Sequence, residues 1–404
     1  MGSRGIRDKV CIVGMGCIPF GEHWDLSTDD MLLDAATATL NSAGVALDDI
    51  DAYWLGTAAS GISGLTLSRA LRIGDKPVTR LENMCATGSE ALRNASYAVA
   101  SGAYDVAMAI GVEKLKDSGF SGLTRMSIPS DGTGSVMGDT TPPANFSLLA
   151  PAYAKKYGVD PQELKDVMAR IAWKNHQNGA RNPLAQFRKA PALEAICASP
   201  LVAGSLGVFD CSGVADGAAA AIVVRAEDAY RYTDKPLYVK GLSLVAGKAA
   251  GSMDPGYDFT SFPEVVKSAA DAYAQAGVTD PRAELAMAEV HDCFTPTELV
   301  LMEDLGFAER GFGWKEVLAG TYDLDGELAV NPDGGLKSFG HPIGASGLRM
   351  LFEAWLQLRH EAPPERAIKS VTEGGRKLAL THNLGGAPGE CVSFVSFVGS
   401  EPSA

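Results

Sequence analysis

The chain has 404 residues, of which 46% are hydrophobic and 21% charged, so it is long enough for one large domain or two fused ones. Its formal net charge of −14 argues against nucleic acid and anionic membranes as partners, because the long-range field repels both. The 7 cysteines are odd in number and contain no CxxC pair, which argues against a disulfide framework and against a structural metal site.

No apolar run approaches the about 20 residues that a membrane span needs. The first apolar run is short and interrupted by glycines, so it predicts a strand and not a signal peptide. We therefore expect a cytoplasmic protein.

The first part of the chain alternates strand and helix signals. Strands are expected at 10–13, 52–55, 78–81 and 106–110, and helices at 28–42 and 89–101. Ser27 or Thr28 is expected to cap the first helix and Gly44 to end it. This alternation indicates parallel strands covered by helices.

Residues 113–205 interrupt the alternation. Gly, Ser, Pro and Met recur there at irregular spacing, and helical segments are expected at 151–157 and 161–178. Strand-like runs follow at 217–224 and 237–244. The pattern predicts a large insertion between strands of an α/β domain.

The second part of the chain repeats the order of the first. Residues 35–55 and 269–290 both read as helix, Ala-Gly-Val, acidic turn and apolar strand. A glycine-containing segment opens a helix at 83–88, and another opens the helix expected at 348–360. Two fused halves related by pseudo-symmetry would bring these two helix N-termini together at the centre. We expect an N-terminal half of 1–112 and 206–235, an inserted domain of 113–205 and a C-terminal half of 236–404.

Cys85 follows an expected strand and precedes an expected helix. Unpaired N–H groups at a helix N-terminus favour a thiolate, so this position predicts a lowered thiol pKa. It also leaves a backbone N–H free to hold a developing oxyanion. The alternative is a buried and inert cysteine.

Histidines occur at three further segment ends. His341 lies in a Gly-Pro-Gly loop that fixes its backbone, and it could take the thiol proton of Cys85. His291 follows the apolar strand expected at 285–290, at the end where open α/β sheets bind ligands. His382 follows a strand expected at 378–381 and begins either a polar site segment or a plain glycine turn.

Five motifs together resemble the thiolase superfamily, over essentially the whole chain. They are Asn-Met-Cys-Ala-Thr-Gly-Ser at 83–89, His-Asp-Cys-Phe at 291–294, Asn-Pro-Asp-Gly-Gly at 331–335, Gly-His-Pro-Ile-Gly-Ala-Ser-Gly at 340–347 and His-Asn-Leu-Gly-Gly at 382–386. More narrowly, the chain is similar to thiolases of the sterol-carrier-protein type and their bacterial and archaeal relatives, the benzoylsuccinyl-CoA type included. The resemblance implies an α/β fold of two pseudo-symmetric βαβαβαββ halves in an α-β-α-β-α core, with a loop-domain insertion.

The resemblance also implies catalytic roles. Cys85 matches the acylated nucleophile, and His341 matches the histidine that activates it and lines the first oxyanion hole. Most thiolases have an Asn-Glu-x-Phe motif where this chain has His-Asp-Cys-Phe, so His291 takes the place of the asparagine that supports this hole.

One departure from the usual family pattern shifts the acid/base role. Most thiolases carry a second cysteine in a late Cys-x-Gly motif, where this chain has Asn383. In the sterol-carrier type the cysteine of His-Asp-Cys-Phe supplies that function, so the resemblance assigns it to Cys293. The N–H of Gly385, with that of Cys85, would form a second oxyanion hole.

Coenzyme A is an anion, and a local basic segment exists in this acidic chain. Residues 170–189 contain no Asp or Glu, and the resemblance implies that the inserted loop domain binds CoA. The expected CoA contacts are Arg170, Lys174, Arg181, Arg188 and Lys189, with Ser346 in the C-terminal half. The alternative is a solvated helix face.

The expected activity is an acyltransferase that cleaves or forms a β-ketoacyl-CoA through an acyl-cysteine, with CoA as substrate and no prosthetic group. The alternatives are an aldolase, a ketosynthase or a polyketide-type acyltransferase on the same scaffold, or a non-catalytic lipid-binding or scaffold subunit. The resemblance further implies a homodimer, and relatives in this subgroup also work with a small partner subunit that carries an OB fold and a zinc ribbon.

Overall fold

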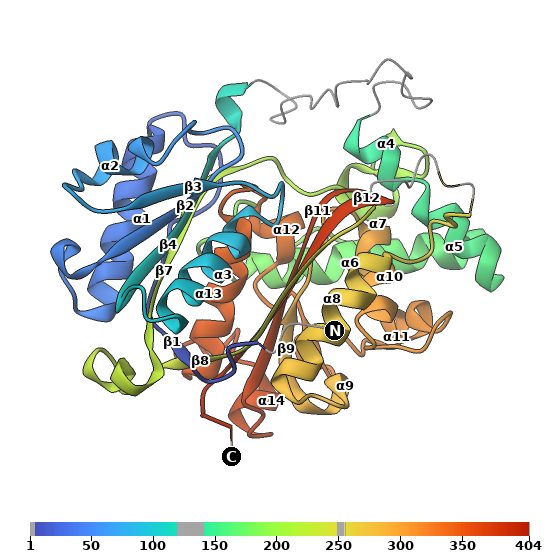
Figure 1. The fold of residues 1–404 in the computed structure, drawn as a ribbon. Coiled ribbons are helices and arrows are strands. Elements are labelled where there is room, and N and C mark those ends of the chain that lie inside the picture. The colour runs from blue at the N-terminus through green and yellow to red at the C-terminus, as the bar shows by residue number, and fades with distance from the viewer. Residues whose placement is uncertain (1–4, 119–140, 249–253, 255, 404) are drawn as a thin grey trace.

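The computed structural model describes residues 5–118, 141–248, 254 and 256–403 (Figure 1). Its main sheet has 10 strands in the order β10-β9-β11-β12-β8-β1-β7-β4-β2-β3. Every strand expected from the sequence is present. The bounds are Val10–Cys17 (β1), Ala52–Gly56 (β2), Val78–Leu81 (β3), Val106–Lys114 (β4), Asp216–Arg225 (β7), Leu237–Ala246 (β8), Leu285–Glu289 (β9), Ala329–Val330 (β10), Leu378–Ala387 (β11) and Glu390–Gly399 (β12).

The expected duplication is visible in the strand order. The first five strands of the sheet in chain order are β1, β2, β3, β4 and β7. From the edge of the sheet inward they lie in the order β3-β2-β4-β7-β1. The five strands from β8 to β12 lie in the equivalent order from the other edge, β10-β9-β11-β12-β8. In each set the second strand runs parallel to its two neighbours and the fifth antiparallel to its own. The sets join where β1 pairs with β8.

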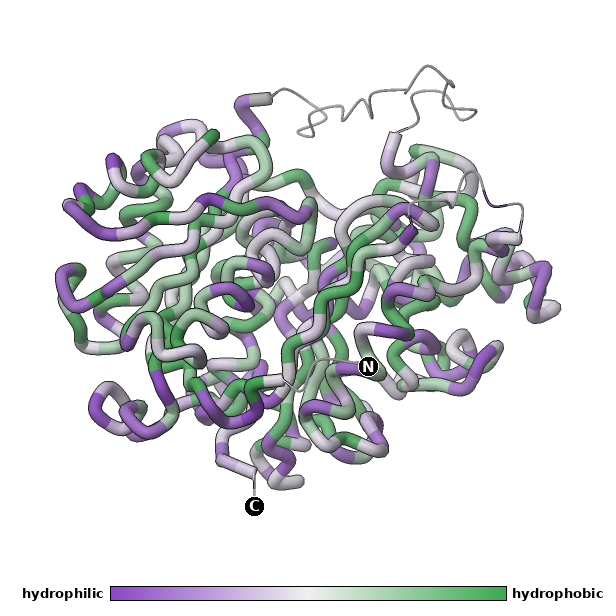
Figure 2. Tube along the Cα trace, viewed as in Figure 1, coloured by the Kyte–Doolittle hydropathy of each residue, from purple (hydrophilic) through white to green (hydrophobic). Residues whose placement is uncertain are grey.

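Helices form the remaining layers of the α-β-α-β-α core. Helices α3 (Thr87–Ala100) and α13 (Ser346–Leu358) lie between the two strand sets and share one hydrophobic cluster with strands of both (Figure 1). Helices α1 (Thr28–Ala43) and α2 (Leu65–Leu71) cover the outer face of the N-terminal set. Helices α8 (Pro263–Ala276) and α10 (Thr295–Asp304) cover the outer face of the other. The hydrophobic residues follow the strands, and the hydrophilic ones gather in peripheral loops (Figure 2).

Local signals explain the first helix as expected. The Ser27 side chain accepts from the N–H of Asp30 while the Asp30 carboxylate accepts from the N–H of Ser27, which is a complete capping box. Gly44 ends the helix in the left-handed region, at φ 66°.

The N-termini of α3 and α13 meet at the centre, as the pseudo-symmetry predicted. A Cβ at Gly111 of β4 would lie 2.1 Å from the carbonyl oxygen of Gly344, and one at Gly88 of α3 would lie 2.8 Å from the same atom. Only glycine allows this approach between backbones. The contact sets the distance between Cys85, just before α3, and His341, just before α13.

The inserted region packs mainly on the C-terminal strand set. Its residues Phe146, Leu149 and Tyr153 share a hydrophobic cluster with α8 and α10. Its elements are α4 (Pro142–Phe146), α5 (Leu149–Tyr157), α6 (Pro161–Ala180), α7 (Leu193–Cys197), β5 (Leu201–Ala203) and β6 (Leu206–Gly207). The remaining helices are α9 (Pro281–Glu284), α11 (Gly313–Ala319), α12 (Gly335–Phe339) and α14 (Lys369–Thr372).

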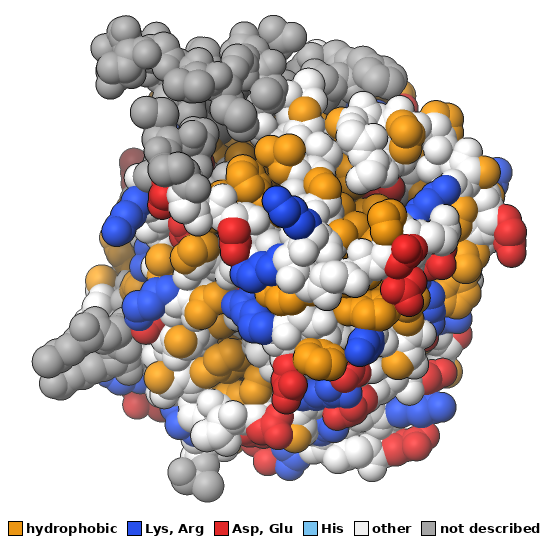
Figure 3. Space-filling view, turned by 90° about the vertical axis from the view of Figure 1, so that its right-hand side faces the viewer, with side chains coloured by type: hydrophobic (Ala, Val, Ile, Leu, Met, Phe, Trp, Pro, Cys, Tyr) orange, Lys and Arg blue, Asp and Glu red, His pale blue; other side chains and the backbone are white. Residues whose placement is uncertain are grey.

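The face on the right of Figure 1, where α5 and α11 lie, carries basic and hydrophobic side chains side by side (Figure 3). Among the described residues, no helix is both long and apolar enough to span a membrane. One expected boundary is wrong. The segment His382–Gly386 does not follow a strand but lies inside β11, because β12 pairs with β11 along its whole length.

Candidate active site

A strained turn presents Cys85 at the start of α3. Met84 has a positive φ of 51°, which is costly for a residue with a side chain. The hydroxyl of Thr87 holds the turn from inside: it accepts from the N–H of Asn83 at 2.9 Å and donates to the carbonyl of Met84 at 2.6 Å. The turn therefore fixes the direction of the Cys85 side chain.

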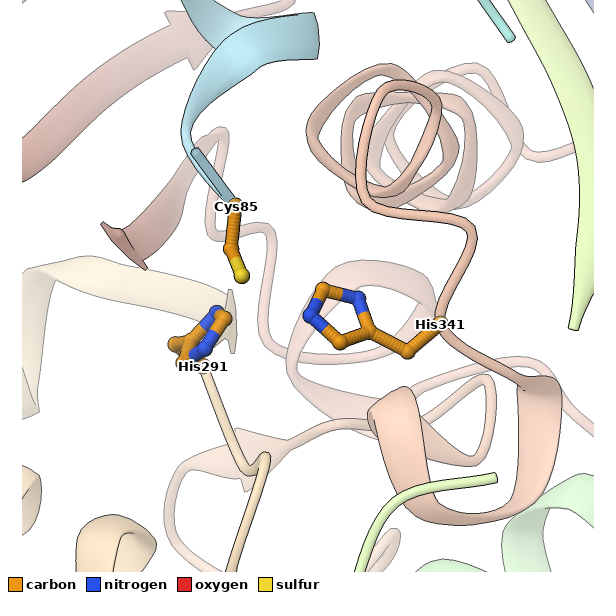
Figure 4. A group of neighbouring side chains, drawn as sticks. All are labelled: Cys85, His291 and His341. Carbon is orange, nitrogen blue, oxygen red and sulfur yellow. The ribbon is translucent and has the colours of Figure 1, made fainter. Parts of the chain in front are cut away.

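Two histidines from distant segments meet Cys85. One ligand atom each of Cys85, His291 and His341 lies within 4.8 Å of the others. The Cys85 sulfur points between the two imidazole rings (Figure 4). The ring centroids are 5.3 Å apart and the planes cross at 77°, so the rings meet edge to face. Both imidazoles are buried, whereas Cys85 is partly exposed. The structure thus brings together three of the four side chains that the sequence predicted as catalytic.

Two contacts of the Ser346 hydroxyl serve to assign a tautomer to His341. The Ser346 hydroxyl donates its one proton to the carbonyl of Pro342 at 3.0 Å. The 2.8 Å contact between His341 Nδ1 and Ser346 Oγ therefore has Nδ1–H as donor. Nε2 then carries a lone pair, and it is buried with no hydrogen-bond partner among the described residues. His341 Nε2 is therefore available as a proton acceptor, and the ring faces Cys85 (Figure 4).

The three residues His291, Asp292 and Cys293 point to three different places. His291 lies in the site beside His341. Asp292 turns inward, where its carboxylate accepts from the N–H of Leu336 at 2.6 Å and from the Asn175 amide at 2.8 Å. These bonds fix the backbone on which the two neighbouring side chains depend.

Cys293 lies at the start of α10. Its thiol contacts the Thr297 hydroxyl at 3.7 Å, and its carbonyl accepts from the N–H of Ser212 at 2.8 Å. Burial raises the pKa of the Cys293 thiol, and the nearby Cys85 sulfur raises it further. Cys293 lies two residues beyond His291, on the segment that enters α10.

Burial controls the protonation of the site. It raises the pKa of Cys85 to about 12, with Glu113 and Glu82 acting in the same direction. This contradicts the expected lowering, because desolvation outweighs the helix N-terminus here. Burial lowers the pKa of His341 to about 3, and that of His291 falls well below its usual value. At neutral pH the free site holds a neutral thiol between two neutral imidazoles.

A buried cluster of one arginine and two acidic residues lies next to the site. The Arg349 guanidinium, fully buried on α13, pairs with Glu289 at 2.8 Å and with Asp333. Its charge disfavours protonation of both His291 and His341. The ion pairs tie α13 to the end of β9, which is the strand that leads to His291.

The segment around Asn383 and Gly385 lies against the turn that carries Cys85. Asn383 is buried and accepts from the Ser89 hydroxyl at 2.6 Å, so it braces α3. A Cβ on Gly385 would lie 2.6 Å from the carbonyl oxygen of Asn83. Gly385 therefore runs beside the turn that carries Cys85.

Two of the expected CoA contacts, Lys174 and Ser346, need correction. Lys174 is buried, bonds the Val330 carbonyl at 2.7 Å and pairs with Glu298 at 3.1 Å, so it is a structural cation. Arg170 pairs with Asp323. Ser346 is fully buried and is occupied with His341. The Lys174 and Ser346 side chains are therefore occupied within the protein, whereas the partly exposed Arg170 stays a predicted CoA contact.

The other three basic residues of the segment, Arg181, Arg188 and Lys189, are exposed. Their neighbour Phe187 donates its N–H to the Ser338 carbonyl at 2.9 Å. A Cβ on Gly213 would lie 2.5 Å from the Phe187 ring. The Gly213 carbonyl in turn accepts from the N–H of His341. Phe187, which precedes Arg188 and Lys189, thus packs on the segment that holds the backbone of His341.

Sequence reasoning missed Glu113. This fully buried carboxylate at the end of β4 accepts from the N–H groups of Ala58, Ala59 and Ser60, each at 2.9 Å, and from that of Gly344 at 3.2 Å. It thereby holds the His341 loop against the N-terminal strand set. The sequence contains little signal for it, because Glu113 lies beyond the strand expected at 106–110 and is followed directly by Lys114.

The fold and the site define a class of α/β proteins. Its members consist of two duplicated halves, with a cysteine and a histidine brought together at the N-termini of the two central helices. The sequence pattern of the thiolase N-terminal domain matches residues 10–193, and that of the thiolase C-terminal domain-like family matches residues 248–395. The chain is 36% identical over 391 residues to an acetyl-CoA acetyltransferase of Methanothermobacter thermautotrophicus, which covers 95% of this chain and 98% of that one.

The chain belongs to the thiolase superfamily. It is also 29% identical to a benzoylsuccinyl-CoA thiolase subunit of Thauera aromatica, over 94% of this chain and 98% of the other. Among solved structures, an Ltp2-ChsH2(DUF35) aldolase matches with a TM-score of 0.83 at 22% identity, over 99% of this chain and 100% of that one. That likeness concerns the fold.

Proposed function

We propose that the protein is an acyl-CoA acyltransferase that cleaves or forms a β-ketoacyl-CoA through an acyl-cysteine at Cys85. The observation that carries the proposal is the convergence of Cys85, His291 and His341 within 4.8 Å, with a bare His341 Nε2 in the site. The relatives named acetyl-CoA acetyltransferase support the same class.

Each group has a defined task in this proposal. His341 Nε2 takes the proton of the Cys85 thiol while the sulfur attacks the carbonyl carbon of the substrate. His291 supports the oxygen that becomes negative, with the His341 imidazole on the other side. In the cleavage direction the carbon–carbon bond breaks, and Cys293 protonates the leaving enolate. Cys293 then removes the proton of the incoming CoA thiol, whose sulfur takes the acyl group from Cys85.

We assign the anionic part of CoA to the exposed residues Arg181, Arg188 and Lys189. They are exposed, and they give an acidic protein a local positive field. Phe187, next to Arg188, packs on the segment that holds the His341 backbone. Replacing Arg188 and Lys189 with glutamine should raise KM for acyl-CoA by roughly tenfold and leave kcat nearly unchanged, because charge contacts far from the reacting atoms contribute uniform binding.

The covalent step is tested by intact-protein mass spectrometry after incubation with a panel of acyl-CoAs. We expect one acyl adduct, absent in Cys85→Ala. The Cys293→Ala variant should acquire the adduct but fail to turn over. The matched control is Cys211→Ala, a partly exposed cysteine that should acylate and turn over normally. Turnover in Cys85→Ala would refute the acyl-cysteine and favour an aldolase.

We also propose that the protein works as a homodimer. Strand β3 lies at the edge of the main sheet, and Ile62 and Leu65 beside it are 96% and 74% exposed. Apolar side chains at an unpaired sheet edge favour pairing with another chain. Ile62→Lys with Leu65→Lys should produce a monomer in size-exclusion chromatography with light scattering; an unchanged mass would place the interface elsewhere. A benzoylsuccinyl-CoA thiolase relative is named as a subunit, so copurification with a small partner is a second readout.

A further inference from the structure

Three side chains in the site, one thiol and two imidazoles, are of the types that bind transition metals. Cys85 offers a sulfur and the two imidazoles offer nitrogens, all within 4.8 Å of one another. This is the donor chemistry that Zn²⁺ takes up in three-ligand sites, with metal–sulfur distances of about 2.3 Å and metal–nitrogen distances of about 2.0 Å. Side-chain adjustments of about 1 Å would bring the donors to such distances.

The imidazoles are prepared to bind a cation. His341 Nε2 and His291 Nδ1 are both buried and have no hydrogen-bond partner among the described residues. The Nδ1–H of His341 is held by Ser346 at 2.8 Å, which is the outer support that metal-bound histidines usually have. A neutral imidazole can bind a cation without first losing a proton.

We propose that Cys85, His291 and His341 form a binding site for a zinc-type divalent cation, and that the bound cation reversibly blocks the nucleophile. On binding, the metal–sulfur bond forms, the sulfur–hydrogen bond breaks, and one proton leaves to solvent; no electrons are transferred. This inference rests on the proposed function only in taking Cys85 as the nucleophile. A histidine at position 291, where most thiolases have asparagine, is what completes the ligand set.

The partly exposed Cys85 gives the cation a route to the two buried nitrogens. The three ligands come from three separate segments, which is why no zinc motif is visible in the sequence. Three protein ligands also leave one tetrahedral position open, so a water molecule can complete the coordination.

The test uses the untagged full chain with Co²⁺ as a spectroscopic probe and Zn²⁺ as competitor. Wild-type protein should show a thiolate-to-cobalt charge-transfer band that Zn²⁺ abolishes. Calorimetry in two buffers should give one proton released per ion. Zn²⁺ should also slow alkylation of Cys85, read by peptide mass spectrometry, by roughly tenfold or more, and a chelator should restore it.

Variants separate this site from adventitious binding. Cys85→Ser should lose the charge-transfer band. His291→Asn should weaken Zn²⁺ binding by more than about 100-fold, because even outer-sphere changes cost about 10–100-fold. Cys293→Ala should keep the band. A wild-type protein without the band, or a band that survives in Cys85→Ser, would overturn the proposal.

Failure of the metal site and failure of the proposed function remain distinguishable. Metal binding is read without substrate, and acyl adducts are read in chelator-treated buffer. An enzyme that acylates normally but shows no cobalt–thiolate band would lose only the metal site.

Discussion

Replacing Ser346 with alanine tests the role of His341 Nε2 as proton acceptor while Cys85 and His341 themselves stay unchanged. The Ser346 hydroxyl accepts the His341 Nδ1–H at 2.8 Å, and alanine leaves this buried N–H without a partner. An unsatisfied buried donor costs about 1–3 kcal/mol. That penalty disfavours the tautomer with the proton on Nδ1. The neutral ring therefore carries its proton on Nε2, which is the atom that has to accept the Cys85 proton.

Because each 1.36 kcal/mol corresponds to about tenfold in rate, acylation of Cys85 should slow by roughly 5- to 150-fold. The measurement is rapid mixing with acyl-CoA, acid quench and intact-protein mass spectrometry. The matched control is Ser96→Ala in α3, since the Ser96 hydroxyl is buried with no hydrogen-bond partner among the described residues. It should acylate at the wild-type rate. Equal rates in both variants would refute the assigned tautomer.

Three further predictions concern the site's protonation and its support. The pKa of His341, lowered to about 3, and that of Cys85, raised to about 12, imply that acylation is flat between about pH 6 and 9; an acid limb in that window would contradict a neutral pair. Gly111→Ala would place a Cβ 2.1 Å from a facing backbone carbonyl and should abolish acylation or folding, whereas Gly74→Ala, with open space around it, should do neither. Arg349→Met leaves two buried carboxylates unpaired and should lower the free energy of unfolding by about 3–5 kcal/mol in chemical denaturation.

The fold followed from the sequence where signals were local or repeated. The Ser27 cap and the Gly44 stop are determined by neighbours within a few residues, and both are in place. The duplicated order of elements predicted that the helices after Cys85 and His341 would meet. Their meeting is enforced by glycines that the same motifs contain.

The basic segment shows what a local pattern cannot reveal. Residues 170–189 contain no acidic residue, yet Lys174 is neutralised by Glu298, which is far away in the sequence. Ser346 was likewise expected to contact CoA, and only the packing shows that its hydroxyl is engaged with His341. Charge in a sequence window says little about which charges a fold pairs and buries.

The strand expected at 378–381 is present, but its end was predicted too early. The segment at 382–386 was expected to be a polar site segment or a glycine turn after the strand. Strand length is set by the partner, however, and β12 pairs with every residue from Leu378 to Ala387. Glycine is tolerated there because the nucleophile turn approaches closely at Gly385.

The lowered histidine pKa and the raised thiol pKa have one consequence for reactivity. If the Cys85 proton moved to His341 before substrate arrived, a thiolate and an imidazolium would both be buried, next to the cation of Arg349. Burial penalises both charges, so the free enzyme holds the proton on sulfur. In the proposed acyl transfer, the carbonyl oxygen of the substrate becomes negative between His291 and His341 as the sulfur attacks, and this charge offsets the new imidazolium. We therefore expect proton transfer and attack to be coupled, so that the substrate itself activates the nucleophile.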